Sequence, residues 1–234
     1  MKLAIMQPYV FPYIGYFQLI AIVDQFVIHD DVQWIKGGWI NRNRILVNGQ
    51  SHYITFPIQK GASTLNINER EFSADIDSCK KKILLQIEGA YRKAPYFTSV
   101  FSLISRCLAC EEKIVSRFAT NSLRECCNYL DITTPFVMSS ELDKSNELTA
   151  EARVLDINKV MGASHYINPI GGMELYNQTR FSEKGLILNF IKSRDIVYKQ
   201  FQGDNCVPFL SIIDVMMFNS KVDILGMLRE YDLL

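Results

Sequence analysis

The first 31 residues, MKLAIMQPYVFPYIGYFQLIAIVDQFVIHDD, decide the fold class. Residues 3–6 form a short apolar run of strand length, and residues 26–29 form a second one. Between them, residues 14–23 are strongly apolar and of helical length, and Pro8 and Pro12 mark a loop before them. A strand, loop, helix and strand within about 30 residues is typical of a βαβ unit, so this stretch predicts a parallel sheet with buried strands.

The next part of the chain combines a hairpin pattern with a long helical one. Residues 44–47 and 52–56 are strand-like and flank Asn48-Gly49, which is a strong hairpin signal. From residue 76 to residue 129 the apolar residues recur at helical spacing, and Ala94-Pro95 breaks this block into at least two helices.

The remaining residues return to alternating helices and strands. We expect a helix at 148–161 that ends at Gly162, strands at 165–169 and 186–190, a helical stretch at 171–176, and closing helices at 211–218 and 222–231. The prediction is an α/β fold with a mostly parallel central sheet and flanking helices. Residues 1–234 would form a single domain with a helical insertion or subdomain at about 76–130.

Composition excludes several classes of protein. The chain has 48% hydrophobic residues, and its 25 Lys and Arg balance 25 Asp and Glu, so it is neither disordered nor a general nucleic-acid binder. We see no secretory signal and no apolar run of about 18 residues, so we expect a cytoplasmic protein without membrane insertion. The cysteines at 107, 110, 126 and 127 lie in helical, apolar-periodic sequence and indicate buried thiols. We therefore expect no metal, and no motif indicates a cofactor.

The loop after the first predicted strand is the first candidate ligand site. It contains Gln7, Tyr13, Gly15 and Tyr16, and it would lie at the carboxyl end of a parallel strand, where α/β proteins bind ligands. Gly15 would let a ligand approach the backbone. The layout is similar to that of nucleotidylyltransferases, but tyrosines replace their two histidines. Alternatively, this is an aromatic turn that only packs.

Two further candidates follow the second predicted strand. Asp30 and Asp31 are adjacent, so one would point into the cleft as a general base or substrate ligand, unless both belong to a solvated turn or helix cap. Gln33 follows them closely and is a further candidate substrate ligand. Asn41, Arg42, Asn43 and Arg44 form a cation-rich stretch suited to phosphate and sugar recognition, and the alternative is an exposed basic loop.

The last candidates lie in the second half of the chain. Asn168, Gly171 and Gly172 would form a second wall of the cleft, and His165 is a candidate acid or base, although a lone histidine is more often structural. Asp214 lies in a nearly apolar run three residues after Ser211, so it is either part of a helix cap or a site carboxylate.

At these residues the chain resembles the WbqC-like family. The matching segments are IMQPYVFPYIGYFQLI, VDQFVIHDDVQW, GWINRNRI, YRKAPYF, GASHYIN and LSIIDVMMFN, which run from residue 5 to residue 219. The resemblance implies a bacterial protein of surface-polysaccharide biosynthesis, including lipopolysaccharide O-antigen.

Together, these observations favour a transferase. We expect group transfer, with acyl or aminoacyl transfer as one candidate, onto a nucleotide-activated or amino sugar. Two alternatives remain: a nucleotidylyltransferase-like enzyme, and a non-catalytic sugar-binding or adaptor protein of the same pathway. The expected partner is a phosphorylated or nucleotide-activated sugar, and a homo-oligomer is left open.

Overall fold

The computed structural model describes residues 1–201 and 206–234, and it confirms the α/β class. Its centre is a six-stranded sheet in the order β5-β2-β1-β6-β7-β8, in which only β8 is antiparallel to its neighbour. The sheet strands are β1 (Lys2–Met6), β2 (Gln25–Ile28), β5 (Phe136–Met138), β6 (His165–Pro169), β7 (Ile187–Ser193) and β8 (Tyr231–Leu233).

The side chains of alternate β1 residues are buried on opposite faces of the sheet, as expected for a strand covered on both sides. Ala4 belongs to the large core that contains Phe17 of α1 (Ile14–Ala21), whereas Leu3 and Ile5 belong to a second core on the other face. That second core is covered by α5 (Ala150–Val160) and α6 (Gln178–Glu183).

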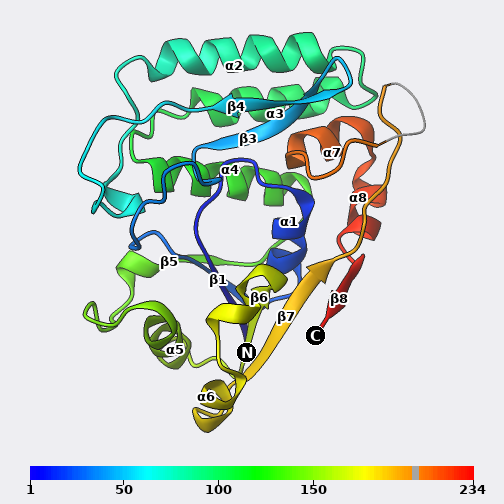
Figure 1. Cartoon of the computed structure of the whole chain (residues 1–234). Helices are drawn as coiled ribbons and strands as arrows, with labels where there is room; N and C mark the ends of the chain where they lie inside the picture. Colours follow the sequence, from blue (N-terminus) through cyan, green and yellow to red (C-terminus); the bar gives the residue numbers. More distant parts are fainter. Residues whose placement is uncertain (202–205) are drawn as a thin grey trace.

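The predicted hairpin and helical block lie together on the α1 side of the sheet (Figure 1). The hairpin consists of β3 (Arg42–Val47) and β4 (Gln50–Thr55), which start two residues before the predicted strands, and Asn48 and Gly49 both have positive φ in the turn. The helical block is α2 (Ile76–Tyr91), α3 (Phe97–Ala109) and α4 (Val115–Tyr129), preceded by the short 3₁₀ helix η1 (Ile67–Glu69). Ile83, Leu103 and Phe118 join these helices to the same large core as Ala4.

Several elements differ from the sequence prediction. Gly162 has a positive φ and ends α5 as predicted. Residues 170–175, however, form a 3₁₀ helix, η3 (Ile170–Leu175). A further 3₁₀ helix, η2 (Ser139–Glu141), follows β5. The closing helices are α7 (Ile212–Phe218) and α8 (Lys221–Met227). The predicted last helix is too long because residues 231–233 pair with β7 instead.

Candidate functional site

The sheet has a switch point between β1 and β6, where open α/β sheets bind ligands. The connection through α1 runs from β1 to β2 on one side, and the connection through η3 and α6 runs from β6 to β7 on the other. Gln7 follows β1, Asp30 and Asp31 follow β2, and Asn168 lies near the end of β6. Four of the predicted site residues therefore lie along one edge of the sheet.

The loop after β1 is clamped between the hairpin and the start of α7. The backbone N–H of Val10 donates to Ile40 O at 3.1 Å, and Asn43 Nδ2 donates to Val10 O at 3.1 Å. On the other side, the N–H of Ile212 donates to Pro12 O at 2.8 Å. Segments far apart in sequence thus meet around this loop, and the predicted basic stretch is one of them.

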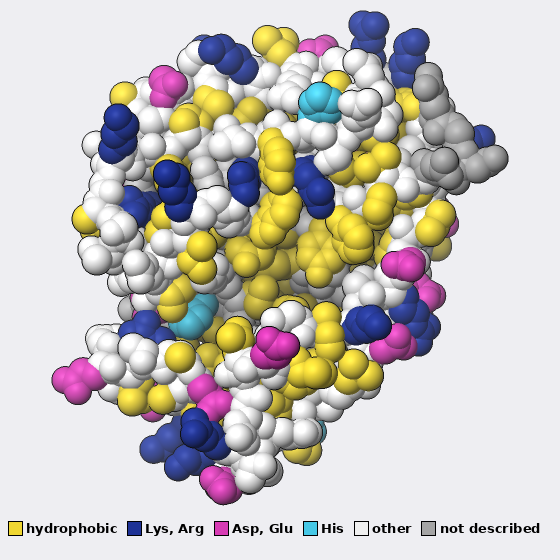
Figure 2. Space-filling model, viewed as in Figure 1, with side chains coloured by type: hydrophobic (Ala, Val, Ile, Leu, Met, Phe, Trp, Pro, Cys, Tyr) yellow, Lys and Arg dark blue, Asp and Glu magenta, His cyan; other side chains and the backbone are white. Residues whose placement is uncertain are grey.

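These segments enclose a cavity of about 260 Å³, which we call the aromatic cavity. Figure 2 shows that this face of the molecule has a hollow with an apolar floor, and that Lys and Arg side chains line its rim near the hairpin. The residues that line the aromatic cavity are Tyr9, Pro12, Tyr13, Trp39, Asn43, Arg44 and Phe209. Aromatic walls with one cation suit a ligand that has a flat ring and an anionic group.

The guanidinium groups of the hairpin are held by aromatic rings. The Cζ of Arg42 lies 4.9 Å from the centre of the Tyr53 ring, and that of Arg44 lies 5.2 Å from the Trp39 ring. Arg44 also donates one hydrogen bond to Phe209 O at 3.2 Å. Within the described part of the chain neither arginine forms an ion pair. Arg42 already donates to the backbone carbonyls of Gly37 and Gly38, whereas Arg44 lines the aromatic cavity, so the charge of Arg44 is available to an anion there.

A second cavity, of about 320 Å³, lies next to the segment that follows β7, and we call it the β7 cavity. Ser193, Asp195 and Tyr198 contribute to its wall. Tyr13 and Phe209 line this cavity as well as the aromatic cavity. The two cavities are therefore neighbours that share an aromatic partition.

The structure separates the two adjacent aspartates. Asp30 is only 2% exposed, and its two carboxylate oxygens accept hydrogen bonds from the backbone N–H of Ser140 at 3.0 Å and its hydroxyl at 2.7 Å. Burial raises the pKa of Asp30 more than these bonds lower it. Asp30 therefore anchors the segment that follows β5, and both of its carboxylate oxygens are already occupied.

Asp31 belongs to a charged cluster with residues of two later segments. Its Oδ2 lies 2.5 Å from the buried Nζ of Lys144, and its backbone carbonyl accepts a bond from Arg153 at 2.7 Å. Burial is the largest single effect and raises the pKa of Asp31, but hydrogen bonds and the charges of Lys144 and His29 together outweigh it, and the net shift is downward. His29 Nε2 lies 3.9 Å from Asp31 Oδ1, and both atoms are buried without a hydrogen-bond partner. Burial lowers the pKa of His29 to about 4, so the imidazole is neutral at pH 7.

The predicted amide groups mostly bind the protein's own backbone. Asn41 Nδ2 donates to Phe56 O at 2.7 Å, and Gln33 Nε2 donates to Ser63 O at 3.0 Å. Asn43 holds Val10, as described above, and also lines the aromatic cavity. These side chains shape the loops of the site, which residue type and position alone did not indicate.

The loop after β1 also differs from the expectation. Tyr16 is buried, its hydroxyl donates to Gln7 O at 2.7 Å, and burial raises its pKa well above the usual value. A Cβ at Gly15 would lie 2.4 Å from the Tyr13 ring. Gly15 therefore makes room for Tyr13 rather than for a ligand, and of the two tyrosines only Tyr13 faces the cavities.

The second predicted wall is only partly assembled. Asn168 Nδ2 donates to Tyr166 Oη at 2.6 Å, and a Cβ at Gly172 would lie 2.1 Å from Asn168 Oδ1, so Gly172 makes room for that amide. Gly171 next to it is exposed. His165, the predicted acid or base, pairs with Lys2 at the opposite edge of the sheet. Because β6 runs parallel to β1, His165 at the start of β6 cannot reach the edge of the sheet formed by the carboxyl ends of the strands.

Asp214 is neither a cap nor an open site carboxylate. It is fully buried and accepts hydrogen bonds from Tyr91 at 2.7 Å, Tyr198 at 2.6 Å and Gln200 at 2.7 Å, and burial raises its pKa. Ser211 caps α7 by itself. The three partners of Asp214 come from α2 and from the segment after β7, so sequence spacing could not reveal the network.

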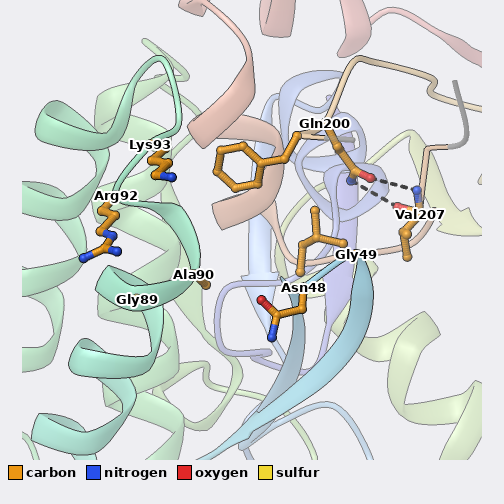
Figure 3. Close-up of a pocket in the computed structure, with 10 residues that line it drawn as sticks. Asn48, Gly49, Gly89, Ala90, Arg92, Lys93, Gln200 and Val207 are labelled. Atoms are coloured by element: carbon orange, nitrogen blue, oxygen red, sulfur yellow. Dashed lines mark hydrogen bonds between the residues drawn. The ribbon is translucent and has the colours of Figure 1, made fainter. Parts of the chain in front are cut away.

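A third cavity, of about 470 Å³, lies beyond this network and contains none of the predicted site residues. Figure 3 shows Arg92 and Lys93 on one side of it and Gln200 on the other, where Gln200 accepts a hydrogen bond from the N–H of Val207 at 2.9 Å. Another hollow, of about 760 Å³, lies between α5 and α6 and also lacks predicted site residues. The aromatic cavity is therefore chosen as the candidate ligand site for the residues that line it and not for its volume.

The described residues contain no cluster of three His, Cys, Asp or Glu side chains that could hold a metal ion. All six cysteines are free, and burial raises the pKa of Cys107 and Cys127 to about 12. No described helix is both long and apolar enough to cross a membrane.

Comparison with known proteins connects the chain to one family. The model of the WbqC-like protein family matches residues 7–224. Among curated proteins, the chain is 30% identical over 223 residues to "Uncharacterized protein Rv1507c" of Mycobacterium tuberculosis (strain ATCC 25618 / H37Rv), and the match covers 93% of each chain. No solved structure gives a significant match.

Proposed function

Since this chain belongs to the WbqC-like protein family, we propose that it is a cytoplasmic enzyme of bacterial surface-polysaccharide biosynthesis. The proposed reaction is the transfer of a group, with acyl or aminoacyl transfer as one candidate, onto a nucleotide-activated or amino sugar. The aromatic cavity would bind the phosphorylated substrate, and the charged cluster after β2 would handle the proton that the acceptor loses.

The observation that carries this proposal is the pairing of one cation, Arg44, with aromatic walls in one cavity. Arg44 lines the aromatic cavity without a carboxylate partner in the described residues, and its Cζ lies 5.2 Å from the centre of the Trp39 ring. A guanidinium can donate two parallel hydrogen bonds to a phosphate. The rings of Tyr9 and Tyr13 offer flat apolar faces to a base or sugar.

The charged cluster supports an acid–base role. Asp31 keeps one carboxylate oxygen without a partner while Lys144 holds the other, so the carboxylate stays ionised in a buried position. His29 beside it is neutral at pH 7. An ionised carboxylate next to a neutral imidazole can take up the proton of an acceptor hydroxyl that reaches the exposed part of the two side chains, which is 12% for Asp31 and 15% for His29.

Calorimetry with UDP-glucosamine tests the proposal. We expect the wild-type protein to bind this probe and Arg44→Gln to bind it about 10- to 150-fold more weakly, which corresponds to the loss of one charged hydrogen-bond donor.

Arg106→Gln is the matched control. Arg106 is an exposed arginine of α3 that pairs with Glu125 at 3.7 Å, and its loss should leave binding unchanged. Equal affinity of the wild-type protein and Arg44→Gln would contradict the proposal, as would the absence of binding.

A further inference from the structure

Two aromatic side chains stand between the aromatic cavity and the β7 cavity. Tyr13 and Phe209 line both cavities, and their side chains are 37% and 64% exposed. Neither ring is therefore buried in the hydrophobic core, and both can contact a ligand. With volumes of about 260 and 320 Å³, each cavity is small for a nucleotide sugar, and together they offer room for one.

The backbone of Phe209 has a conformation that residues other than glycine rarely adopt. Its φ is +55°, in the left-handed region. Arg44 fixes this segment with two hydrogen bonds. Its guanidinium donates to the carbonyl of Phe209 at 3.2 Å, and its backbone carbonyl accepts from the N–H of Ser211 at 2.8 Å. Because the ring of Phe209 is exposed, its strained backbone is not offset by packing of the side chain in the core. Backbone strain of this kind is concentrated at functional sites.

The two compartments carry opposite free charges. The aromatic cavity contains the unpaired guanidinium of Arg44. In the β7 cavity, Arg194 is neutralised by Asp232 at 2.6 Å and Glu230 at 3.5 Å, whereas Asp195 forms no ion pair or hydrogen bond with any described residue. An anionic group is therefore favoured on one side of the partition and a cationic group on the other.

We propose that this site binds an amino-sugar nucleotide across both compartments. Its phosphate lies at Arg44, its sugar ring lies beside Tyr13 and Phe209, and its ammonium group lies at Asp195. The inference rests on the proposed function and narrows its substrate to activated sugars that carry a free amine. A neutral sugar nucleotide would satisfy Arg44 but would leave the carboxylate of Asp195 unpaired.

Calorimetry with two nearly isosteric probes, UDP-glucosamine and UDP-glucose, tests this inference. Below neutral pH, where the amine is protonated, wild-type protein should bind UDP-glucosamine about 5-fold more tightly, which is the discrimination that a solvent-accessible ion pair supports. Asp195→Asn should abolish this preference and leave the affinity for UDP-glucose unchanged. Arg44→Gln should weaken both probes equally and keep the preference.

Asp77→Asn, which alters an exposed aspartate in the first turn of α2, is the matched control and should keep the wild-type preference. Equal affinity of the wild-type protein for the two probes would overturn the inference, and so would a preference that survives in Asp195→Asn. In both cases binding itself would persist and the proposed function would stand. If neither probe binds, the proposed function fails and this inference fails with it.

Discussion

Acidification should weaken the fold through His29, and the structure gives the size of the effect. Burial lowers the pKa of this imidazole to about 4, whereas an unfolded histidine titrates near about 6.5. Between these values the unfolded state binds more protons than the folded state, so stability is complete above the unfolded pKa and is lost as the pH falls towards the folded one. From about pH 7.5 to about pH 4.5 the loss amounts to about 2.5 kcal/mol.

Urea unfolding at a series of pH values measures this loss. His29→Gln removes the titrating group, so the difference in free energy of unfolding between wild type and variant should change by about 2.5 kcal/mol across that range. His52→Gln, an exposed position on β4, controls for the loss of an imidazole. If wild type and His29→Gln show the same pH dependence, the buried neutral imidazole beside Asp31 is not a feature of the folded protein.

Two further substitutions test how the site is supported. Tyr91→Phe leaves Asp214 and a backbone N–H of β3 each short of one partner, so it should cost about 2 to 4 kcal/mol in urea unfolding, and an unchanged midpoint would refute the network. Gly15→Ala should displace the ring of Tyr13 and weaken UDP-glucosamine binding in calorimetry. Gly89→Ala, in α2 with open space around it, should not affect binding, and equal binding by both variants would show that Tyr13 is not part of the site.

Local sequence patterns were sufficient for the elements whose apolar faces are continuous. The runs at 3–6 and 26–29 became adjacent parallel strands in which Leu3 pairs with Gln25, and the break at Ala94-Pro95 separates α2 from α3. By contrast, β5 and β8 have three residues each. Such short strands exist because they pair with β2 and β7, and a local pattern of three residues carries no signal of a partner so far away in sequence.

The candidate site was predictable only in outline. That polar residues after β1 and β2 share one edge follows from parallel pairing. The different partners of the two aspartates, Ser140 for Asp30 and Lys144 for Asp31, lie more than 100 residues later in the chain, and no spacing rule connects them. The position of His165 at the opposite edge is hidden for the same reason, because only the pairing of β6 with β1 shows at which edge it lies.

The partition between the two cavities was not visible in the sequence at all. Phe209 is an ordinary apolar residue in the sequence, and its role depends on a positive φ and on the hydrogen bond from Arg44. The residue types of the basic stretch predict phosphate binding, and the structure adds that its guanidinium groups lie against the rings of Trp39 and Tyr53.

A crystal structure of the protein with UDP-glucosamine tests the central claim most directly. We expect the diphosphate within hydrogen-bonding distance of Arg44 and the sugar ring beside Tyr13 and Phe209. Density for the nucleotide in another cavity, such as the one beside Arg92 and Lys93, with the aromatic cavity empty, would contradict the account.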